Sequence, residues 1–334
     1  MSELFSNFPI AGVSNLPTPI RPLTAIGDNL FMKQDNLSGP VYGGNKIRKL
    51  EFLLGEALAE GRKTVITYGA AGSNHALATA VCCRQLGLKS ISILTPQKTN
   101  DHVRKNILMQ HAVGAELHLC PDHTHFPALT THQLSAQCTG EPYIIPTGGT
   151  NTTGALGFVN AAFELVSQTA RLPCPDVIYL PMGTGGTLAG LLVGLRLAGL
   201  KTRIEAIRVV DPAFRNEAHI KQLCDDLCAK LDVGPVVENS DITIRDEFYG
   251  EDYGIPTPEG RAAVELFQTL ENVHLENTYT GKTAAALLHD LRSGALDGQT
   301  ILYWNTLNSR DFSNQISAID FHDLPPKFHP YFES

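Results

Sequence analysis

The stretch KTVITYGAAGSNHALATAVCCRQLGLKSISIL (residues 63–94) decides the fold, because it contains one strand, one helix and a second strand in succession. Its first six residues are a compact β-branched run, and a Gly/Ser/Asn turn then leads into an apolar helix over about 75–86. Residues 90–94 form the next short apolar run. A strand, a helix of a dozen or so residues and another strand are typical of parallel strands with helices on the sheet faces.

The same alternation continues along the chain in two series. In the first series we expect helices near 101–112 and 127–138 and strands at 115–119 and 143–145. In the second we expect strands at 176–182, 203–210, 242–246 and 300–304, with helices at 186–199, through the 220s, at 258–271 and at 281–291. No long linker separates the series, which predicts two α/β domains with a cleft between them and ligand groups at the carboxyl ends of the strands.

Composition limits the classes of function. The chain has 334 residues, 43% hydrophobic and 18% charged, so it can bury a sizeable core and is long enough for about two domains. A formal charge of −8 and the lack of a Lys/Arg-rich run argue against a nucleic-acid surface. The first residues lack a basic segment followed by an apolar one, and no stretch approaches the ~18 apolar residues of a membrane span. We therefore expect a cytoplasmic protein without membrane contacts.

The cysteines and one histidine-rich segment do not form a regular framework. Cys82 and Cys83 are adjacent, Cys224 and Cys228 are one helical turn apart, and the total of seven is odd, so we interpret them as reduced thiols. The segment HLCPDHTH (118–125) could coordinate zinc by its composition. Because no second cluster with zinc spacing supports it, a polar loop is the preferred interpretation and no metal is predicted.

Residues 43–51, GGNKIRKLE, place Lys46 after a Gly-Gly-Asn turn, at the start of a helix whose next turn carries Arg48 and Lys49. Backbone N–H groups at a helix N-terminus collect anions, so this amine can serve as a Schiff-base nucleophile beside a phosphate. A solvated basic helix start would explain the same residues. Lys46 becomes informative because other segments point to the same chemistry.

Two loops that follow predicted strands carry further polar groups. GAAGSNHA (69–76) places Ser73, Asn74 and His75 at a helix start, where they can converge on a ligand, although a helix cap alone would explain Ser73 or Asn74. MGTGGTLAG (182–190) makes a nest of backbone N–H groups ahead of a helix. The second loop is suited to one phosphate.

That loop does not fit a dinucleotide or a nucleoside triphosphate. In the G-x-G-x-x-G pattern counted from Gly183, Leu188 stands where the third glycine belongs, and the Gly-Lys-Ser/Thr end of a Walker A loop is absent. A cradle for one phosphate and a lysine that can form an imine are the two requirements of pyridoxal 5'-phosphate. The sequence therefore predicts this cofactor.

A series of segments, in order along the chain, then carries a family resemblance. They are KQDNLSGPVYGGNKIRKLEFLL, GAAGSNHALATA, PTGGTNTTGALGFVNAAFEL, MGTGGTLAGLLVGL, EDYGIPTPEGRAAVEL and NTYTGKTAAALL. Together they resemble the fold type II pyridoxal-phosphate enzymes of the aminocyclopropane-carboxylate deaminase and D-cysteine desulfhydrase family. The resemblance implies a two-domain, tryptophan synthase β-like α/β fold with open parallel sheets flanked by helices, and a homodimer. It places the larger cofactor domain in 1–51 plus 161–334 and a smaller α/β domain in 52–160.

The resemblance also implies roles for single residues. The catalytic residues would be Lys46, which binds the cofactor covalently, Ser73, which meets the substrate carboxylate or carries a proton at Cα, and Tyr253 and Tyr279, which face the substrate side chain. Besides Lys46, cofactor contacts would come from Lys49, Asn74, Gly183, Thr184, Gly185, Gly186, Thr187 and Thr306. Substrate contacts would come from Ser73, Asn74, His75 and Thr280.

The implied reaction is β-elimination from a small amino acid, which gives a 2-oxo acid and ammonia. Thr306 is the candidate partner of the pyridine nitrogen, and a hydroxyl there makes the ring a weaker electron sink than a carboxylate would. Ring-opening deaminases carry YEGK and an apolar residue near the end of the last strand, whereas this chain has YTGK, with Thr280, and Thr306. In these two positions it resembles the desulfhydrases.

Two departures leave the substrate open. GAAGSNH replaces the family's GAIQSNH, and NTLNSRD replaces HTGG. Cysteate sulfo-lyase and aminocyclopropane-carboxylate deaminase activities therefore stay as alternatives. A non-catalytic pyridoxal-phosphate-binding protein is a hypothesis of another class, and the joint retention of Lys46, Ser73, Tyr253 and Tyr279 weighs against it.

Overall fold

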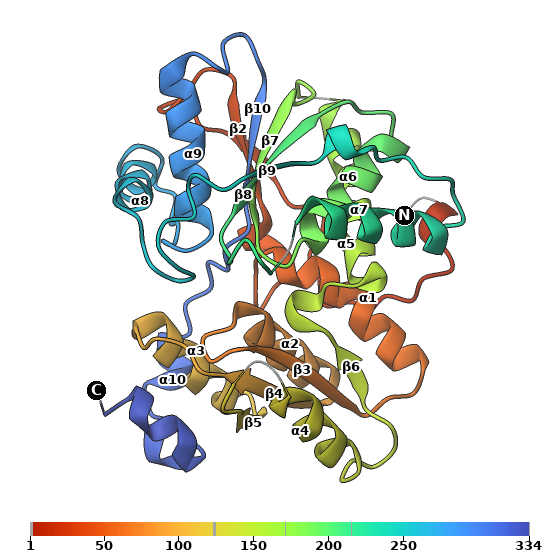
Figure 1. Ribbon diagram of the computed structural model, residues 1–334, viewed down its shortest axis with the longest axis vertical. Helices are drawn as coiled ribbons and strands as arrows, with labels where there is room; N and C mark the ends of the chain where they lie inside the picture. Colours follow the sequence, from red (N-terminus) through yellow and green to blue (C-terminus); the bar gives the residue numbers. More distant parts are fainter. Residues whose placement is uncertain (1–2, 123–124, 171, 215, 334) are drawn as a thin grey trace. The chain divides into compact units, whose positions relative to one another are not determined.

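The computed structural model describes residues 3–122, 125–170, 172–214 and 216–333 (Figure 1). These residues form two compact units, each with its own sheet. The larger unit contains the N-terminal residues up to Ser6, residues 14–49 and residues 150–309, and the smaller unit contains residues 7–13, 50–149 and the chain from Arg310 onward. None of the described helices is both long and apolar enough to cross a membrane.

The larger unit is built on a six-stranded sheet with the order β1-β2-β10-β7-β8-β9. Only the β1–β2 pair is antiparallel. The strands are β1 (Ile20–Pro22), β2 (Leu30–Gln34), β7 (Val177–Met182), β8 (Arg203–Arg208), β9 (Thr243–Arg245) and β10 (Ile301–Asn305). All six residues of β7 are buried, as expected for a central strand with both faces covered.

Helices cover both faces of this sheet. Figure 1 shows α8 (Pro258–Glu271) and α9 (Thr280–Ser293) on one face, and α5 (Thr152–Thr169), α6 (Gly186–Leu197) and α7 (Glu217–Lys230) on the other. The helix α1 (Asn45–Ala59) belongs to both units, because the boundary between them falls after Lys49. Its first turn therefore lies in the larger unit.

The smaller unit has a parallel four-stranded sheet with the order β5-β4-β3-β6. Its strands are β3 (Thr64–Ala70), β4 (Lys89–Thr95), β5 (Glu116–Leu119) and β6 (Tyr143–Ile145), and its helices are α2 (Asn74–Leu86), α3 (Asp101–Ala112), α4 (Phe126–Ser135) and α10 (Ser313–Ile316). Side chains of the C-terminal segment, among them Leu324 and Phe328, pack into one of its core clusters.

The predicted alternation of strands and helices is confirmed, with the ends displaced by a few residues. The structure adds β1, β2 and α5, which were not predicted. The predicted domain boundaries differ from the two units at residues 7–13, 50–51, 150–160 and 310–333. Helix α5 lies in the larger unit, where it approaches α1 so closely that a Cβ on Gly157 would come within 2.0 Å of the Arg48 carbonyl oxygen. The segment 310–333 lies in the smaller unit, because its apolar side chains complete that core.

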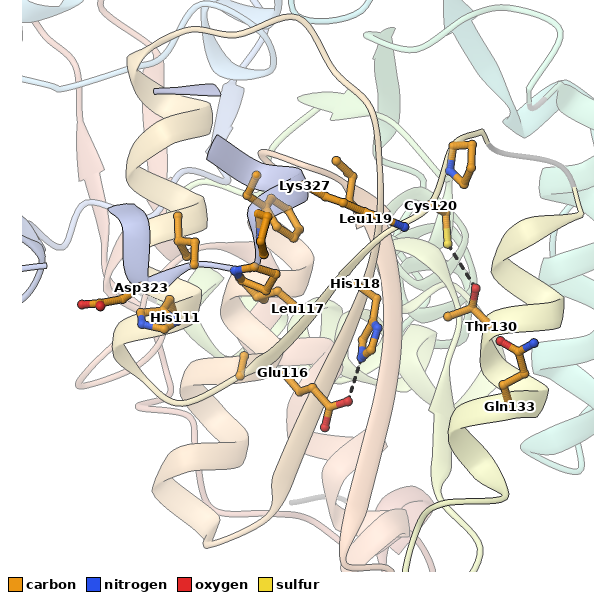
Figure 2. A pocket seen from close by; sticks show the side chains of 16 residues that line it. His111, Glu116, Leu117, His118, Leu119, Cys120, Thr130, Gln133, Asp323 and Lys327 are labelled. Carbon is orange, nitrogen blue, oxygen red and sulfur yellow. Dashed lines mark hydrogen bonds and ion pairs between the residues drawn. The ribbon is translucent and has the colours of Figure 1, made fainter. Parts of the chain in front are cut away.

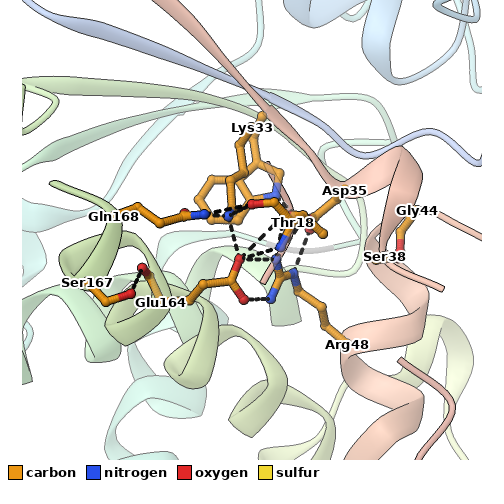
Figure 3. Close-up of polar contacts among 10 residues, drawn as sticks. Thr18, Lys33, Asp35, Ser38, Gly44, Arg48, Glu164, Ser167 and Gln168 are labelled. Atoms are coloured by element: carbon orange, nitrogen blue, oxygen red, sulfur yellow. Dashed lines mark hydrogen bonds and ion pairs between the residues drawn. The ribbon is translucent and has the colours of Figure 1, made fainter. Parts of the chain in front are cut away.

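A buried ion network joins α1, α5 and the loop after β2 (Figure 3). The Arg48 guanidinium donates to both carboxylate oxygens of Asp35, at 2.8 and 2.9 Å, and to those of Glu164, at 2.9 and 3.0 Å. Lys33 donates to Glu164 and to the Gln168 side chain. Burial would raise the pKa of Glu164, but the hydrogen bonds and charge of Arg48, together with Lys33, hold it at about 2. Glu164 is therefore ionised in the folded protein.

The network also reaches the central sheet. The indole nitrogen of Trp304, in β10, donates to Asp35 at 2.8 Å. The Thr18 hydroxyl donates to Asp35 at 2.9 Å and accepts from Arg48. Arg48, Asp35 and Trp304 are all fully buried, so the two charged groups depend on each other and on the Trp304 indole for their hydrogen bonds. The first turn of α1 is thus tied at Arg48 to the central sheet and to α5.

We predict that Arg48→Met destabilises the larger unit by about 3–5 kcal/mol, because two buried carboxylates lose their cation. Trp304 is the only tryptophan of the chain and lies in the network, so its fluorescence during urea unfolding reports this unit. The control is Arg203→Met, which removes an exposed arginine paired with Glu205 in the same sheet and should cost less than about 1 kcal/mol. Equal unfolding midpoints for the two variants would contradict a structural role for the network.

Candidate active site

Lys46 is the second residue of α1, and the turn before it is packed against the end of β10. Gly44 has φ +89°, and a Cβ on it would lie 2.8 Å from the Thr306 carbonyl oxygen. The backbone N–H of Asn45 donates to that same oxygen at 3.1 Å. Only glycine combines this backbone conformation with so close an approach. The Gly-Gly-Asn turn therefore sets where the Lys46 side chain begins.

The Lys46 amine has the acid–base character of a nucleophile. The residue is half-buried, and desolvation lowers its pKa from the ordinary lysine value to about 8. A lysine with such a pKa has a much larger neutral fraction near pH 7 than a solvated one, and the neutral form is the one that attacks a carbonyl. This agrees with the role predicted for Lys46.

Lys49, one turn further along α1, lies against the predicted phosphate loop. It is 1% exposed, and its Nζ donates to the Thr150 hydroxyl at 3.4 Å. Thr150 in turn shares a hydrogen bond of 2.5 Å with Thr184, and the Asn45 side chain donates to Thr187 at 3.2 Å. Thr150 was not predicted, although it directly precedes Asn151, the N-cap of α5, in the quoted GGTNTTG run.

The residues around this loop fit a phosphate group. Helix α6 begins at Gly186 after Gly185, whose φ is +88°, so the loop leads into a helix N-terminus. A Cβ on Gly186 would come within 2.9 Å of Lys49 Nζ and 3.0 Å of Thr150 Oγ1, which means that the missing side chain is what leaves room here. Burial, and then the charge of Lys46, lower the pKa of Lys49. An anion at this position would relieve that unfavourable burial of positive charge.

Tyr253 and Tyr279 lie together in the larger unit. Their hydroxyl groups are 2.9 Å apart and their rings meet edge to face, with centroids 6.1 Å apart. Burial raises the pKa of both phenols, so both are protonated at neutral pH. The Tyr279 ring lies 3.5 Å from where a Cβ of Gly183 would stand, which places it against the phosphate loop. When one phenol donates to the other, the accepting phenol can direct its own O–H to a third group.

The two threonines that were predicted to mark specificity lie at the ends of α9 and β10. Thr280 is fully buried, and its hydroxyl donates to the Glu276 carbonyl oxygen at 3.1 Å and accepts from the Glu276 N–H at 2.9 Å. Thr306 directly follows β10 and is 8% exposed. The Thr280 hydroxyl is thus engaged by the turn before α9, and its role toward a substrate stays a prediction.

Ser73, Asn74 and His75 lie in the smaller unit, at the start of α2 and beyond the carboxyl end of β3. Ser73 is the N-cap of α2, and its hydroxyl accepts from the Ala76 N–H at 3.2 Å. The Asn74 side-chain oxygen accepts from Asn106 at 3.0 Å, a contact that was not predicted. His75 is 3% exposed, and its Nε2 lies 3.0 Å from the Thr67 hydroxyl. The observed hydrogen bond confirms the capping interpretation of Ser73; a catalytic part for it stays a prediction.

Residues 118–121 of the histidine-rich segment line a pocket of about 820 Å³ in the smaller unit (Figure 2). In it, His118 Nε2 lies 2.7 Å from a Glu116 oxygen, and Cys120 lies 3.4 Å from the Thr130 hydroxyl. His123 is outside the described residues. Among the residues that the structure describes, no group of three or more His, Cys, Asp or Glu side chains could hold a metal ion.

Comparison with known proteins identifies the family. The sequence model of the pyridoxal-phosphate dependent enzymes matches residues 14–306, which span both units. The chain belongs to this family. It is 33% identical to a D-cysteine desulfhydrase of Yersinia enterocolitica over 320 residues, which cover 92% of this chain and 96% of the relative. It is 35% identical to a D-cysteine desulfhydrase of Klebsiella pneumoniae over 301 residues, with 85% and 88% covered.

A solved structure of a homologue of aminocyclopropane-carboxylate (ACC) deaminase superposes with a TM-score of 0.80 at 30% identity and covers 94% of this chain and 97% of that one. The fold type II architecture and the pyridoxal phosphate cofactor predicted from the sequence are therefore confirmed. The chain is a pyridoxal-phosphate enzyme of the deaminase and desulfhydrase family. Identities of this size do not fix the substrate.

We predict that Gly186→Ala weakens binding of pyridoxal phosphate by about 10-fold or more, the loss expected for one charge-assisted hydrogen bond. The added methyl group would displace Lys49 and Thr150 from the phosphate loop. Titration of the cofactor-free protein with pyridoxal phosphate measures the Kd. Gly234→Ala is the matched control, because a Cβ there meets nothing within 4 Å and its φ is not positive. An unchanged Kd for Gly186→Ala would remove the loop from the phosphate site.

Proposed function

We propose that this chain catalyses β-elimination and deamination of a small amino acid, giving a 2-oxo acid and ammonia, in the manner of the D-cysteine desulfhydrases. The observation that carries the proposal is the Lys46 amine, with its pKa of about 8. It lies one helix turn from Lys49, which in turn lies against the phosphate loop. The similarity to two D-cysteine desulfhydrases over most of the chain supports the choice of reaction.

Pyridoxal phosphate, when bound, withdraws electrons from the Cα of an attached amino acid. In our proposal Lys46 would hold the cofactor, and its amine, once free, would take up the proton from the substrate Cα. The electron pair of the broken C–H bond forms the Cα=Cβ double bond, and the electron pair of the C–S bond leaves with sulfur as hydrosulfide, which takes up a proton to give hydrogen sulfide. Water then hydrolyses the released enamine to pyruvate and ammonia. Lys49 and the Gly183–Thr187 loop hold the phosphate. Tyr253 and Tyr279 would face the substrate side chain and supply exchangeable protons there.

The remaining proposed contacts come from Ser73, Asn74, His75 and Thr306. Ser73 would meet the substrate carboxylate or carry a proton at Cα. Asn74 would bond the 3-hydroxyl of the cofactor, and His75 would contact the substrate. Thr306 is the proposed partner of the pyridine nitrogen, and a neutral hydroxyl there favours loss of a good leaving group over a long-lived carbanion. This is why we prefer a β-substituted substrate to the cyclopropane ring.

Two other reactions stay as candidates, and one further hypothesis belongs to another class of function. The superposed ACC deaminase homologue supports ring opening as the second candidate. Elimination of sulfite from cysteate is the third, since the altered loops flank the substrate side. A protein that binds the cofactor without turnover is the remaining hypothesis. We further propose a cytoplasmic homodimer, as the family resemblance implies; the seven free thiols are compatible with a reducing compartment.

We predict that the purified protein forms pyruvate from D-cysteine or β-chloroalanine and forms little 2-oxobutanoate from aminocyclopropane-carboxylate. The panel also includes L-cysteine, serine and cysteate, so that the leaving group and the stereochemistry are determined in one experiment. Borohydride should fix the cofactor to the peptide that contains Lys46, and Lys46→Ala should lose this attachment and all turnover. A label on another lysine, or 2-oxobutanoate as the sole product of the panel, would overturn the proposal.

A second prediction separates the two roles of Ser73. Ser73→Ala should lower the stability of the smaller unit by about 1 kcal/mol through the lost cap, and turnover by roughly 10²-fold through the lost substrate group. Asn100→Ala is the control, because Asn100 caps α3 in the same unit by the same kind of bond, with Val103 N–H at 3.0 Å. It should cost similar stability and leave turnover intact. If both variants retain full turnover, Ser73 is a cap alone.

A further inference from the structure

Lys282 is a buried lysine for which the proposed reaction has no use. It is the third residue of α9 and is fully buried. Burial lowers its pKa, while the charges of Glu276 and Asp252 act in the opposite direction. A methionine of similar shape would fill this position without the cost of burying an amine. The amine is therefore explained only by what it bonds.

The Lys282 amine bonds the backbone of one loop. Its Nζ donates to the Tyr249 carbonyl oxygen at 2.5 Å, lies 3.4 Å from that of Asp252, and sits 5.1 Å from the centre of the Tyr249 ring. Residues 246–257 contain neither helix nor strand, so their inward-facing carbonyl groups need donors from elsewhere. Lys282 provides donors for two of them.

That loop carries Tyr253, whose hydroxyl meets the Tyr279 hydroxyl at 2.9 Å. Tyr279 is itself held at the start of α9, because the Glu276 carboxylate accepts hydrogen bonds from the N–H groups of Thr278, Tyr279 and Thr280, each at 2.7 Å. The same helix start thus fixes both phenols. Tyr279 is fixed through its own backbone, and Tyr253 is fixed through the loop that Lys282 bonds.

We propose that Lys282 is a positioning residue, which sets the Tyr253 hydroxyl against that of Tyr279 by holding the carbonyl groups of Tyr249 and Asp252. This rests on the proposed function, in which the two phenols face the substrate. Lys282 itself touches neither substrate nor cofactor in this proposal. Its effect on turnover passes through Tyr253.

The first test is a measurement on the holoenzyme that does not depend on turnover. Fluorine NMR of protein labelled with 3-fluorotyrosine, assigned with Tyr253→Phe and Tyr279→Phe, follows the two phenols directly. Lys282→Met should shift or broaden the Tyr253 and Tyr279 signals and leave those of Tyr143 and Tyr331, which lie in the smaller unit, in place. Lys221→Met is the control, since Lys221 bonds Asp225 on the surface of α7. Unchanged Tyr253 and Tyr279 signals in Lys282→Met would overturn the proposal.

The second test is a double-mutant cycle on turnover. Lys282→Met should lower kcat about 10- to 100-fold with little change in KM, the range expected when a reacting group is misplaced by about 1 Å. In the Tyr253→Phe background the same substitution should have almost no further effect, because the group that it positions is gone. If the fold losses in kcat of the two single variants multiply in the double variant, Lys282 acts independently of Tyr253, and the proposal is wrong.

A variant that keeps a donor covers the case in which Lys282→Met does not fold. Lys282→Gln has a shorter side chain, so its amide can reach at most one of the two carbonyl groups. It should give a smaller displacement of the Tyr253 signal and a smaller loss of kcat, and a Gln variant identical to the wild type in both would contradict the proposal. If none of the substrates yields a product with the wild type, the proposed function fails, while the NMR comparison still decides the role of Lys282.

Discussion

The buried contact between Arg48 and the carboxylates of Asp35 and Glu164 is the constraint on which the larger unit depends. Arg48 lies on α1 between Lys46 and Lys49, which are three residues apart and so share one face of the helix. Because the guanidinium is bonded on both sides, α1 cannot rotate about its axis without leaving two carboxylates buried and unpaired. The network therefore fixes which way the two amines point, although neither of them belongs to it.

The positive charges of Lys46 and Lys49 repel one another. Burial and mutual repulsion lower the pKa of Lys49, and burial lowers that of Lys46. In a chain of net charge −8, a local pair of cations at a helix N-terminus fits the anion site that we propose better than it fits a basic surface. In our proposal the phosphate of the cofactor binds beside the two amines and offsets their repulsion. Binding of the cofactor should therefore raise the free energy of unfolding of the larger unit.

The sequence predicted what depends on neighbours along the chain and missed what depends on distant residues. Apart from α5, the strands and the longer helices from 63 onward follow from short apolar runs and turn residues, and α8 starts at the predicted residue, with Thr257 as its N-cap. Strand β2 was not predicted because its buried Lys33 interrupts the apolar pattern. That lysine is tolerated because Glu164, 131 residues later, pairs with it. Thr150 and Asn106 were missed for the same reason: each acts on a predicted residue that is 32 or more positions away.

Thr280 shows why the substrate is the hardest part to infer. Its hydroxyl donates to and accepts from the backbone of Glu276, and its carbonyl accepts from the Tyr303 hydroxyl, so the residue is bound into the turn that starts α9. A side chain in this state has little left to offer a ligand. If position 280 discriminates between ring opening and β-elimination, it does so by lacking the carboxylate that the ring-opening deaminases carry, and the hydroxyl serves the fold. Specificity at this position would then depend on the absence of a carboxylate. Such an absence has meaning only when the electronic requirements of ring opening and of β-elimination are compared.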